Sequence, residues 1–246
     1  MYFFEDVCMP SDDEEISFYE DVLEFGVLNH NASIAIGLYE QQMYLEEGEE
    51  KSDDGVFQKM KNAILAILDK IDSVIRGFLD GFKAFSKNHL TAEKFMNSST
   101  GQLQLAGDLF KIQKEIDQEY LKLRPLVSKI SKATGEDIEE VAKAADAVTE
   151  HVQAYGKKYG KAAVSLASAV AVNKLANHCV DQMEDVQKWR SETEKSVKRL
   201  KRDERTIKVK AIQSVTKAMS AITTAYKDIG AKAMNALNNA KNKKQN

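Results

Sequence analysis

Proline, glycine and cysteine are all scarce in this chain of 246 residues. It contains 2 prolines and 12 glycines, which is too few for the many tight turns of a β-sandwich or β-barrel. We therefore expect a nearly all-helical fold, an elongated helical bundle with a long C-terminal helix or coiled-coil hairpin. The two cysteines, Cys8 and Cys179, stand far apart and indicate neither a disulfide framework nor a metal-binding knuckle.

Long apolar runs are also missing. A membrane-spanning helix needs about 18 to 20 consecutive apolar residues. The longest candidate, residues 162–172, is short, mostly alanine and interrupted by serines. The N-terminus carries acids where a secretory signal would carry Lys or Arg. We therefore expect a protein that is made and kept in the cytoplasm.

Sequence patterns typical of catalysis are absent as well. The four histidines, His30, His89, His151 and His178, are isolated from one another, and no metal motif, glycine-rich phosphate loop or nucleophile motif appears. The many carboxylates at the N-terminus repel one another in open solvent, which argues against acid–base pairs held at a defined separation. We predict a protein that is not an enzyme and that has no cofactor.

What the chain does have is a strong division of charge. The net charge is only −3, but residues 1–54 hold 16 acids and a single base, Lys51, while the remainder carries a net charge of +12. From residue 186 onward, 16 Lys and Arg stand against 5 acids. Three interpretations fit this pattern: an acidic segment masking a basic surface, a basic tail that binds nucleic acid or anionic lipid, and ordinary solvated helix faces.

The basic C-terminal part supplies candidate phosphate contacts. The single tryptophan, Trp189, lies among them, and a lone aromatic is more typical of helix packing than of base stacking. Nucleic-acid binding here would therefore be non-specific and would run through phosphates. The candidates are Lys188, Arg190, Lys198, Arg199, Lys201 and Arg202.

The patterning predicts three regions: an acidic helical segment with a linker at 1–54, a central amphipathic bundle at 55–160 and a long basic helical region at 161–246. In the first region we expect a helix from Ser11 that Gly26 ends, and a second helix that reaches Glu46. The clearest amphipathic helix follows, over about 30 residues from Val56, because apolar residues recur there every three or four positions. Its predicted packing face consists of Phe57, Ile64, Ile67, Ile71, Phe78 and Phe82.

Further helices are expected beyond a loop at 97–101. One of them follows Leu105 and is ended or kinked by Pro125, and the next is capped by Thr134. Residues 161–229 contain neither Gly nor Pro, yet the apolar seam there is imperfect. We therefore expect partial exposure or a break in this helical region near residues 202–205.

Two short segments carry a resemblance to a known group of proteins. Leu38, Tyr39 and Glu40, and likewise Leu45, Glu46 and Glu47, resemble the Leu-x-Glu sites that prohead proteases of large tailed bacteriophages cut. With its acidic front and basic rear, the chain resembles virion structural or internal head proteins of such phages. The resemblance implies an acidic leader that is cut off in the prohead, and a basic helical product that contacts DNA or capsid and other virion proteins. It implies a location in the virion after synthesis in the host cytoplasm.

Two other function classes stay open at this point. One is a membrane-active helical protein in the style of pore-forming toxins, inserting residues 56–85 or 162–172, although the mixed charges opposite the first apolar face favour core packing over lipid. The other is a coiled-coil scaffold or adaptor that forms homo-oligomers through its long C-terminal helix.

Overall fold

The structure is a computed structural model that describes residues 12–46, 54–89, 102–105, 107–130, 132, 136–159, 165–201 and 206–243. Six helices and one pair of short strands make up these residues, which confirms the expected all-α bundle. The helices are α1 (Asp12–Glu46), α2 (Asp54–His89), α4 (Leu109–Ile130), α5 (Glu136–Tyr159), α6 (Ala169–Arg199) and α7 (Thr206–Lys243), and the strands are β1 (Gln102–Leu105) and β2 (Ser165–Ser168).

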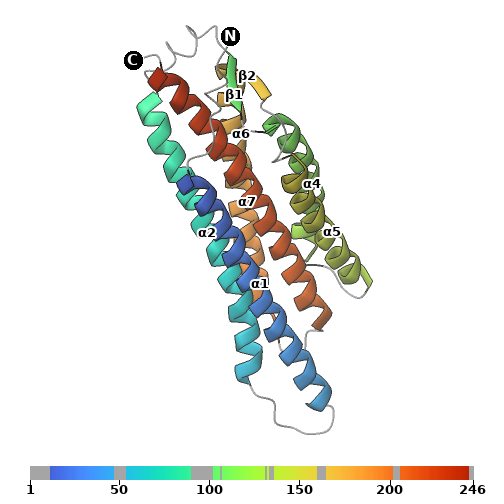
Figure 1. Cartoon of the computed structure of the whole chain (residues 1–246). Coiled ribbons are helices and arrows are strands. Elements are labelled where there is room, and N and C mark those ends of the chain that lie inside the picture. Colours follow the sequence, from blue (N-terminus) through green and yellow to red (C-terminus); the bar gives the residue numbers. More distant parts are fainter. Residues whose placement is uncertain are drawn as a thin grey trace.

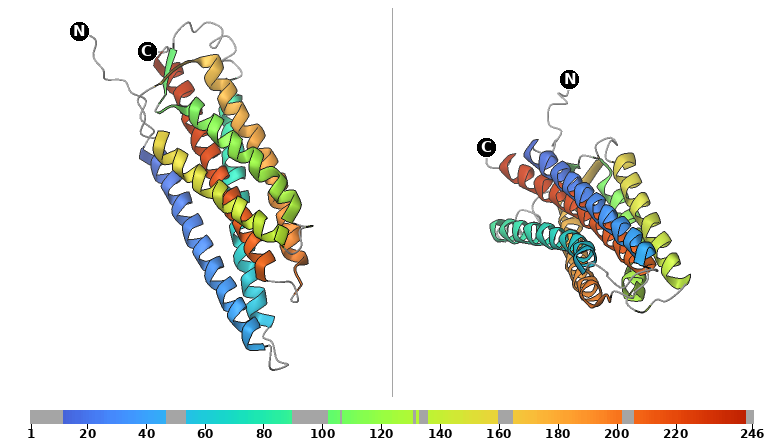
Figure 2. Two further views of the ribbon diagram at one scale, coloured as in Figure 1. Left: turned by 90° about the vertical axis from the view of Figure 1, so that its right-hand side faces the viewer. Right: turned by 90° about the horizontal axis from the view of Figure 1, so that it is seen from below.

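Helix α7 occupies the middle of the bundle. It packs against α1, α2, α4, α5 and α6, and Figure 1 shows it running between α1 and α2 on one side and α4 and α5 on the other. The left view of Figure 2, turned by 90° from Figure 1, also shows the long dimension of the bundle. The C-terminal helix predicted as a seam for self-association is therefore covered by the rest of its own chain.

The composition of α7 explains how it can be buried on most of its circumference. Many of its buried residues are small, and its buried threonine hydroxyls donate to carbonyls of the same helix, as Thr216 does to Ile212 O at 2.8 Å and Thr223 to Met219 O at 2.7 Å. Because these hydroxyls are satisfied within the helix, they need no partner on a neighbour. A helix whose buried residues are apolar or satisfied within the helix can pack against neighbours on several sides.

Helix α2 presents the amphipathic face expected from the sequence. Its packing-face residues Ile64, Ile67, Ile71 and Phe78 are buried, and Phe57 and Phe82 are half-buried against the same core.

The C-terminal end of α6 is held by a lysine of α2. Lys61 donates to Lys198 O at 3.0 Å. A cation at this point satisfies a free carbonyl and interacts favourably with the helix dipole.

The sequence patterning did not predict the strands β1 and β2. They pair antiparallel, with Gln102 opposite Ser168 and Leu105 opposite Ser165, and so join the segments that precede α4 and α6. Gly107 follows β1 with φ of 76°, a left-handed conformation that favours glycine. The Ser165 hydroxyl donates to Gly107 O at 2.8 Å.

One expected helix end is wrong, and a second helix continues through a residue that was expected to end or kink it. Helix α1 continues through Gly26 as one helix of 35 residues, because the tertiary packing of its buried face outweighs the roughly 1 kcal/mol that a helical glycine costs. Helix α4 likewise continues through Pro125 to Ile130. Pro125 is exposed, so the carbonyl of Leu121 that loses its helical donor can bind water instead.

The break expected near residues 202–205 is confirmed, since α6 ends at Arg199 and α7 begins at Thr206. Serine 168 caps the start of α6, its hydroxyl accepting from Ala171 N at 3.2 Å. The expected caps at Ser11 and Thr134 and the expected loop at 97–101 lie outside the described residues.

Close packing between α7 and α2 leads to a stability prediction. An added Cβ at Gly230 would lie 2.4 Å from Phe78 Cζ and 3.2 Å from Cys179 Cβ. Gly230→Ala should therefore lower the free energy of unfolding by about 1–2 kcal/mol, because the buried Phe78 ring must move. At Gly81 of α2 an added Cβ meets nothing within 4 Å, so Gly81→Ala should raise it by about 0.5–1 kcal/mol. Urea unfolding measures both, and equal effects would contradict the close approach.

Candidate functional site

The acidic helix α1 is tied to the basic helices at a buried carboxylate, Asp21. Lys70 Nζ of α2 lies 2.9 Å from Asp21 Oδ1 and 2.6 Å from Glu24 Oε2, and Lys227 of α7 contacts the other oxygen of Asp21. Burial alone would lower the pKa of Lys70, but the hydrogen bonds and charges of Glu24 and Asp21 outweigh it and raise this pKa above its ordinary value. Asp21 therefore joins three helices through charge.

A second set of polar contacts joins α1 to α7 further along. Lys210 Nζ lies 2.5 Å from Glu40 Oε1. Gln213 donates to Asn29 O at 3.2 Å and to Ser33 Oγ at 2.8 Å. The acidic segment thus folds back on the basic remainder, and three lysines of α2 and α7 are neutralised by α1.

Apolar side chains also hold α1 against the rest of the bundle. The buried residues of α1 point into the core of the bundle, and the Tyr39 ring lies with its centroid 5.5 Å from that of Phe57 in α2. Burying side chains of this size is worth about 1.5–3 kcal/mol each. The buried apolar residues of α1 are Phe25, Ala32, Ile36 and Tyr39.

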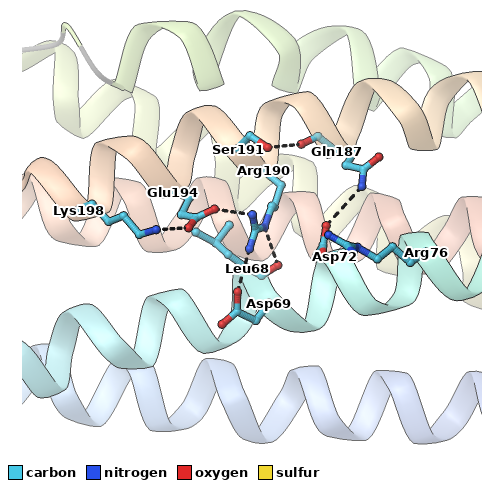
Figure 3. A network of polar contacts seen from close by, with 9 residues as sticks. All are labelled: Leu68, Asp69, Asp72, Arg76, Gln187, Arg190, Ser191, Glu194 and Lys198. Atoms are coloured by element: carbon cyan, nitrogen blue, oxygen red, sulfur yellow. Dashed lines mark hydrogen bonds and ion pairs between the residues drawn. The ribbon is translucent and has the colours of Figure 1, made fainter.

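Between α2 and α6 the central group is Arg190, one of the candidate phosphate contacts. Its guanidinium donates to Asp69 Oδ1 at 2.8 Å and to Leu68 O at 3.2 Å, and also contacts Glu194. Figure 3 shows these contacts together with the adjoining Glu194–Lys198 pair. Contact with Lys198 is the largest cause that lowers the pKa of Glu194, and the charge of Arg190 adds to it.

The other candidate phosphate contacts differ in their surroundings. Lys188 is exposed and paired with Asp185 at 2.7 Å. Arg199 and Lys201 are exposed at the end of α6, and Arg202 lies outside the described residues. The structure thus places Lys188, Arg190 and Lys198 in ion pairs, and it leaves Arg199 and Lys201 exposed at the end of α6.

A half-buried polar cluster joins α4, α6 and α7. Asp117 Oδ1 accepts from Tyr226 Oη at 2.7 Å and lies 2.8 Å from His178 Nε2. The hydrogen bond to Asp117 is the main cause that raises the pKa of His178, and it exceeds the opposing effect of burial. Next to it, the Tyr120 ring stacks on Trp189 with centroids 4.6 Å apart, so Trp189 packs between helices.

Between α1 and α5 lies a groove whose floor is formed by α7 and by Ile112 and Ile116 of α4. Its volume is about 1160 Å³. Gly26, Ser33 and Gly37 of α1 line one edge, and Ala221 and Ala225 belong to the floor. Beside this groove, α1 exposes large apolar side chains to solvent, namely Val22, Leu23, Val27, Ile34 and Leu38.

The candidate cleavage site lies at the end of α1. Leu45 and Glu46 belong to the last turn of the helix, which ends at Glu46, and Glu47 lies outside the described residues. In the alternative tripeptide, Tyr39 is buried and Glu40 is paired with Lys210. Of the two sites, the one at the helix end leaves the buried face of α1 intact when cut.

Sequence reasoning missed the contacts between distant helices and the outer apolar side chains of α1. The pairing of Asp21 with Lys70 and Lys227, or of Asp117 with His178, has no local signal because the partners are far apart in sequence. A signal for the outer side chains did exist: apolar residues recur on both faces of residues 22–39, but the assumed helix end at Gly26 concealed it.

Within the described residues, no group of three or more His, Cys, Asp and Glu side chains is arranged to hold a metal ion. None of the described helices is long and apolar enough to cross a membrane. Comparisons with protein-family models, with curated proteins and with solved structures found no match to this chain.

The Asp21 junction can be tested by neutralising its carboxylate. Asp21→Asn leaves Lys70 and Lys227 with less compensation in a largely buried setting, and should lower the free energy of unfolding by about 1–3 kcal/mol. The control is Asp80→Asn, whose pair with Lys83 is exposed on both sides and is worth less than about 0.5 kcal/mol. Urea unfolding at low salt compares the two, and equal losses would show that the junction contributes no more than a surface pair.

The Asp117–His178 contact predicts a pH dependence of stability. Because the folded pKa of His178 is raised, its contribution is complete below its unfolded pKa of about 6.5 and is lost as pH rises through the folded pKa. The stability difference between the wild type and His178→Gln should therefore be larger at about pH 5.5 than at about pH 9. Denaturant unfolding at both pH values measures it, and a difference independent of pH would refute the charged contact.

Proposed function

We propose that this chain is a non-enzymatic structural component of a large tailed bacteriophage virion, with an acidic N-terminal helix that masks its basic part until it is cut from it. The observation that carries the proposal is the position of α1, whose Asp21, Glu24 and Glu40 neutralise lysines of α2 and α7. This arrangement suits a leader that keeps a basic protein from binding anions before assembly.

The titratable side chains support a structural role. Arg190, Asp117 and His178 all serve contacts between helices in the described bundle. Groups engaged in this way stabilise the relative positions of helices and are poorly placed to act on a small molecule. The proposal therefore assigns function to surfaces of the bundle.

Cleavage after Glu47 would separate α1 covalently and yet leave its buried face in place. Phe25, Ile36 and Tyr39 would still be packed in the core, and the ion pairs of Asp21 would persist. Release would then require competition from DNA phosphates or from another virion protein for the lysines that α1 covers. Arg199 and Lys201 at the end of α6 would add exposed cations to such a contact.

The test is mass spectrometry of particles banded from the native source of the protein. We expect a chain that begins at Gly48 to be recovered together with capsid proteins, because Leu45, Glu46 and Glu47 match the cleavage pattern. Digestion with a protease that does not cut after Glu distinguishes this N-terminus from a product of sample preparation. A full-length chain found only in the soluble cell fraction would contradict the proposal.

A further inference from the structure

The outer side of α1 carries a continuous apolar ridge, which we define as Leu23, Val27, Ile34 and Leu38. These side chains are 69%, 59%, 50% and 52% exposed. At 100° per residue, their spacing of four, seven and four positions places all of them within about 60° of the helix circumference. They form one line along the helix.

The ridge lies opposite the face that α1 buries. Phe25, Ala32, Ile36 and Tyr39, the buried face of α1, fall roughly 180° away by the same helical spacing. A surface helix normally has one apolar stripe and one polar face. A helix with two opposite apolar stripes is suited to being covered on both sides, and within the described residues only one stripe is covered.

Charge is absent along the ridge. No Asp, Glu, Lys or Arg occurs in residues 26–39, although 30% of the whole chain is charged. Of the nearest acids, Asp21, Glu24 and Glu40 are paired with lysines of the same bundle, and Glu20 is exposed at the N-terminal end of the ridge. A protein surface can therefore cover residues 26–39 of the ridge without desolvating a charged side chain of α1. An anionic lipid surface would need flanking Lys or Arg, which α1 lacks.

The groove of about 1160 Å³ lies directly beside the ridge. On its α1 edge, an added Cβ at Gly26 or Gly37 would meet nothing within 4 Å. Each glycine within a helix costs about 0.5–1 kcal/mol, and glycine permits another backbone to approach closely. The groove thus offers room and a small-residue edge for a second helix, as in helix-in-groove recognition.

We propose that the ridge of one chain lies in the groove of a second copy, and the second copy's ridge in the groove of the first. Because ridge and groove lie side by side on one face, a two-fold axis parallel to α1 exchanges them. Over residues 20–42 α1 extends for roughly 35 Å, so a strip about 20 Å wide covers roughly 700 Å² per copy. A stable interface buries about 800 Å² per partner.

A second copy fits this surface better than an unrelated helix does. An unrelated helix in the groove would leave the ridge exposed, whereas the two-fold arrangement covers both features at once. This inference rests on the surface of α1 and on the groove lined by α1, α4, α5 and α7, and it holds whether or not the chain is a virion component.

The experiment is sedimentation equilibrium or light scattering of the full chain at about 1–100 µM. The wild type should reach a mass twice its 27.5 kDa. Ile34→Gln combined with Leu38→Gln should raise the dimer dissociation constant by about 100-fold, because two apolar contacts are lost. The matched control is Leu121→Gln on α4, which is 61% exposed and should leave the constant unchanged.

The groove has its own test in Gly37→Leu. The open space at Gly37 accepts the side chain in the single chain, so the melting temperature should stay the same or rise. The leucine would occupy the space that the second copy's ridge needs, so the dissociation constant should rise at least about tenfold. Gly81→Leu on α2, where an added Cβ also meets nothing within 4 Å, should leave it unchanged.

Three results would overturn the proposal. One is a wild-type chain that stays monomeric at about 100 µM. Another is a dimer that persists in the Ile34 and Leu38 variant or dissociates equally in the Leu121 control. The third is a monomer that binds phosphatidylglycerol vesicles through Ile34 and Leu38, which would assign the ridge to lipid.

Discussion

The structure depends on the burial of α7 among the other helices. Five helices contact it, and each uses α7 as part of its core. Small residues such as Ala211, Ala218 and Gly230 let these neighbours approach, and the buried threonines satisfy their own hydroxyls. A central helix of bulkier or unsatisfied residues would either separate its neighbours or leave polar atoms unpaired.

The acidic and basic parts of the sequence form ion pairs with each other in the fold, which the small net charge of the whole chain does not indicate. A segment with a large excess of acids would repel itself if it stood alone in solution. Docked on α2 and α7, its carboxylates at Asp21, Glu24 and Glu40 instead meet Lys70, Lys227 and Lys210. Fully exposed ion pairs add little to the free energy of unfolding. Asp21 is buried, so leaving it unpaired would cost free energy, and its pairing with lysine fixes the position of α1 at that point. Charge therefore sets where α1 docks, and apolar burial supplies most of its binding free energy.

The spacing of apolar residues was enough to predict those helices whose apolar side chains all lie on one face. For α2, the spacing of Ile64, Ile67 and Ile71 predicts the helix and its buried side together. The end of α6 could be predicted in the same way, from the loss of apolar residues near 202–205.

The error at Gly26, and the helix end that was one of two outcomes expected at Pro125, come from treating local preference as decisive. A preference of about 1 kcal/mol for Gly, or about 3 kcal/mol for Pro in a helix interior, is smaller than the burial gained by a helix that packs along its whole length. Contacts such as Asp117 with His178, and the pairing of β1 with β2, depend on the arrangement of distant segments. No local pattern could indicate them.

Helix α1 links the two proposals, because it carries both the mask and the ridge. Its inner face neutralises lysines and fills the core, and its outer face would hold a second copy. Loss of α1 after cutting would expose Lys70, Lys210 and Lys227 and would remove the ridge and one wall of the groove in the same step. A dimer built on α1 would also oppose that loss, since each α1 would then be held by two chains. Under these proposals, cleavage at the helix end and displacement of the helix would be separate events, and the second would be the one that changes the surface of the protein.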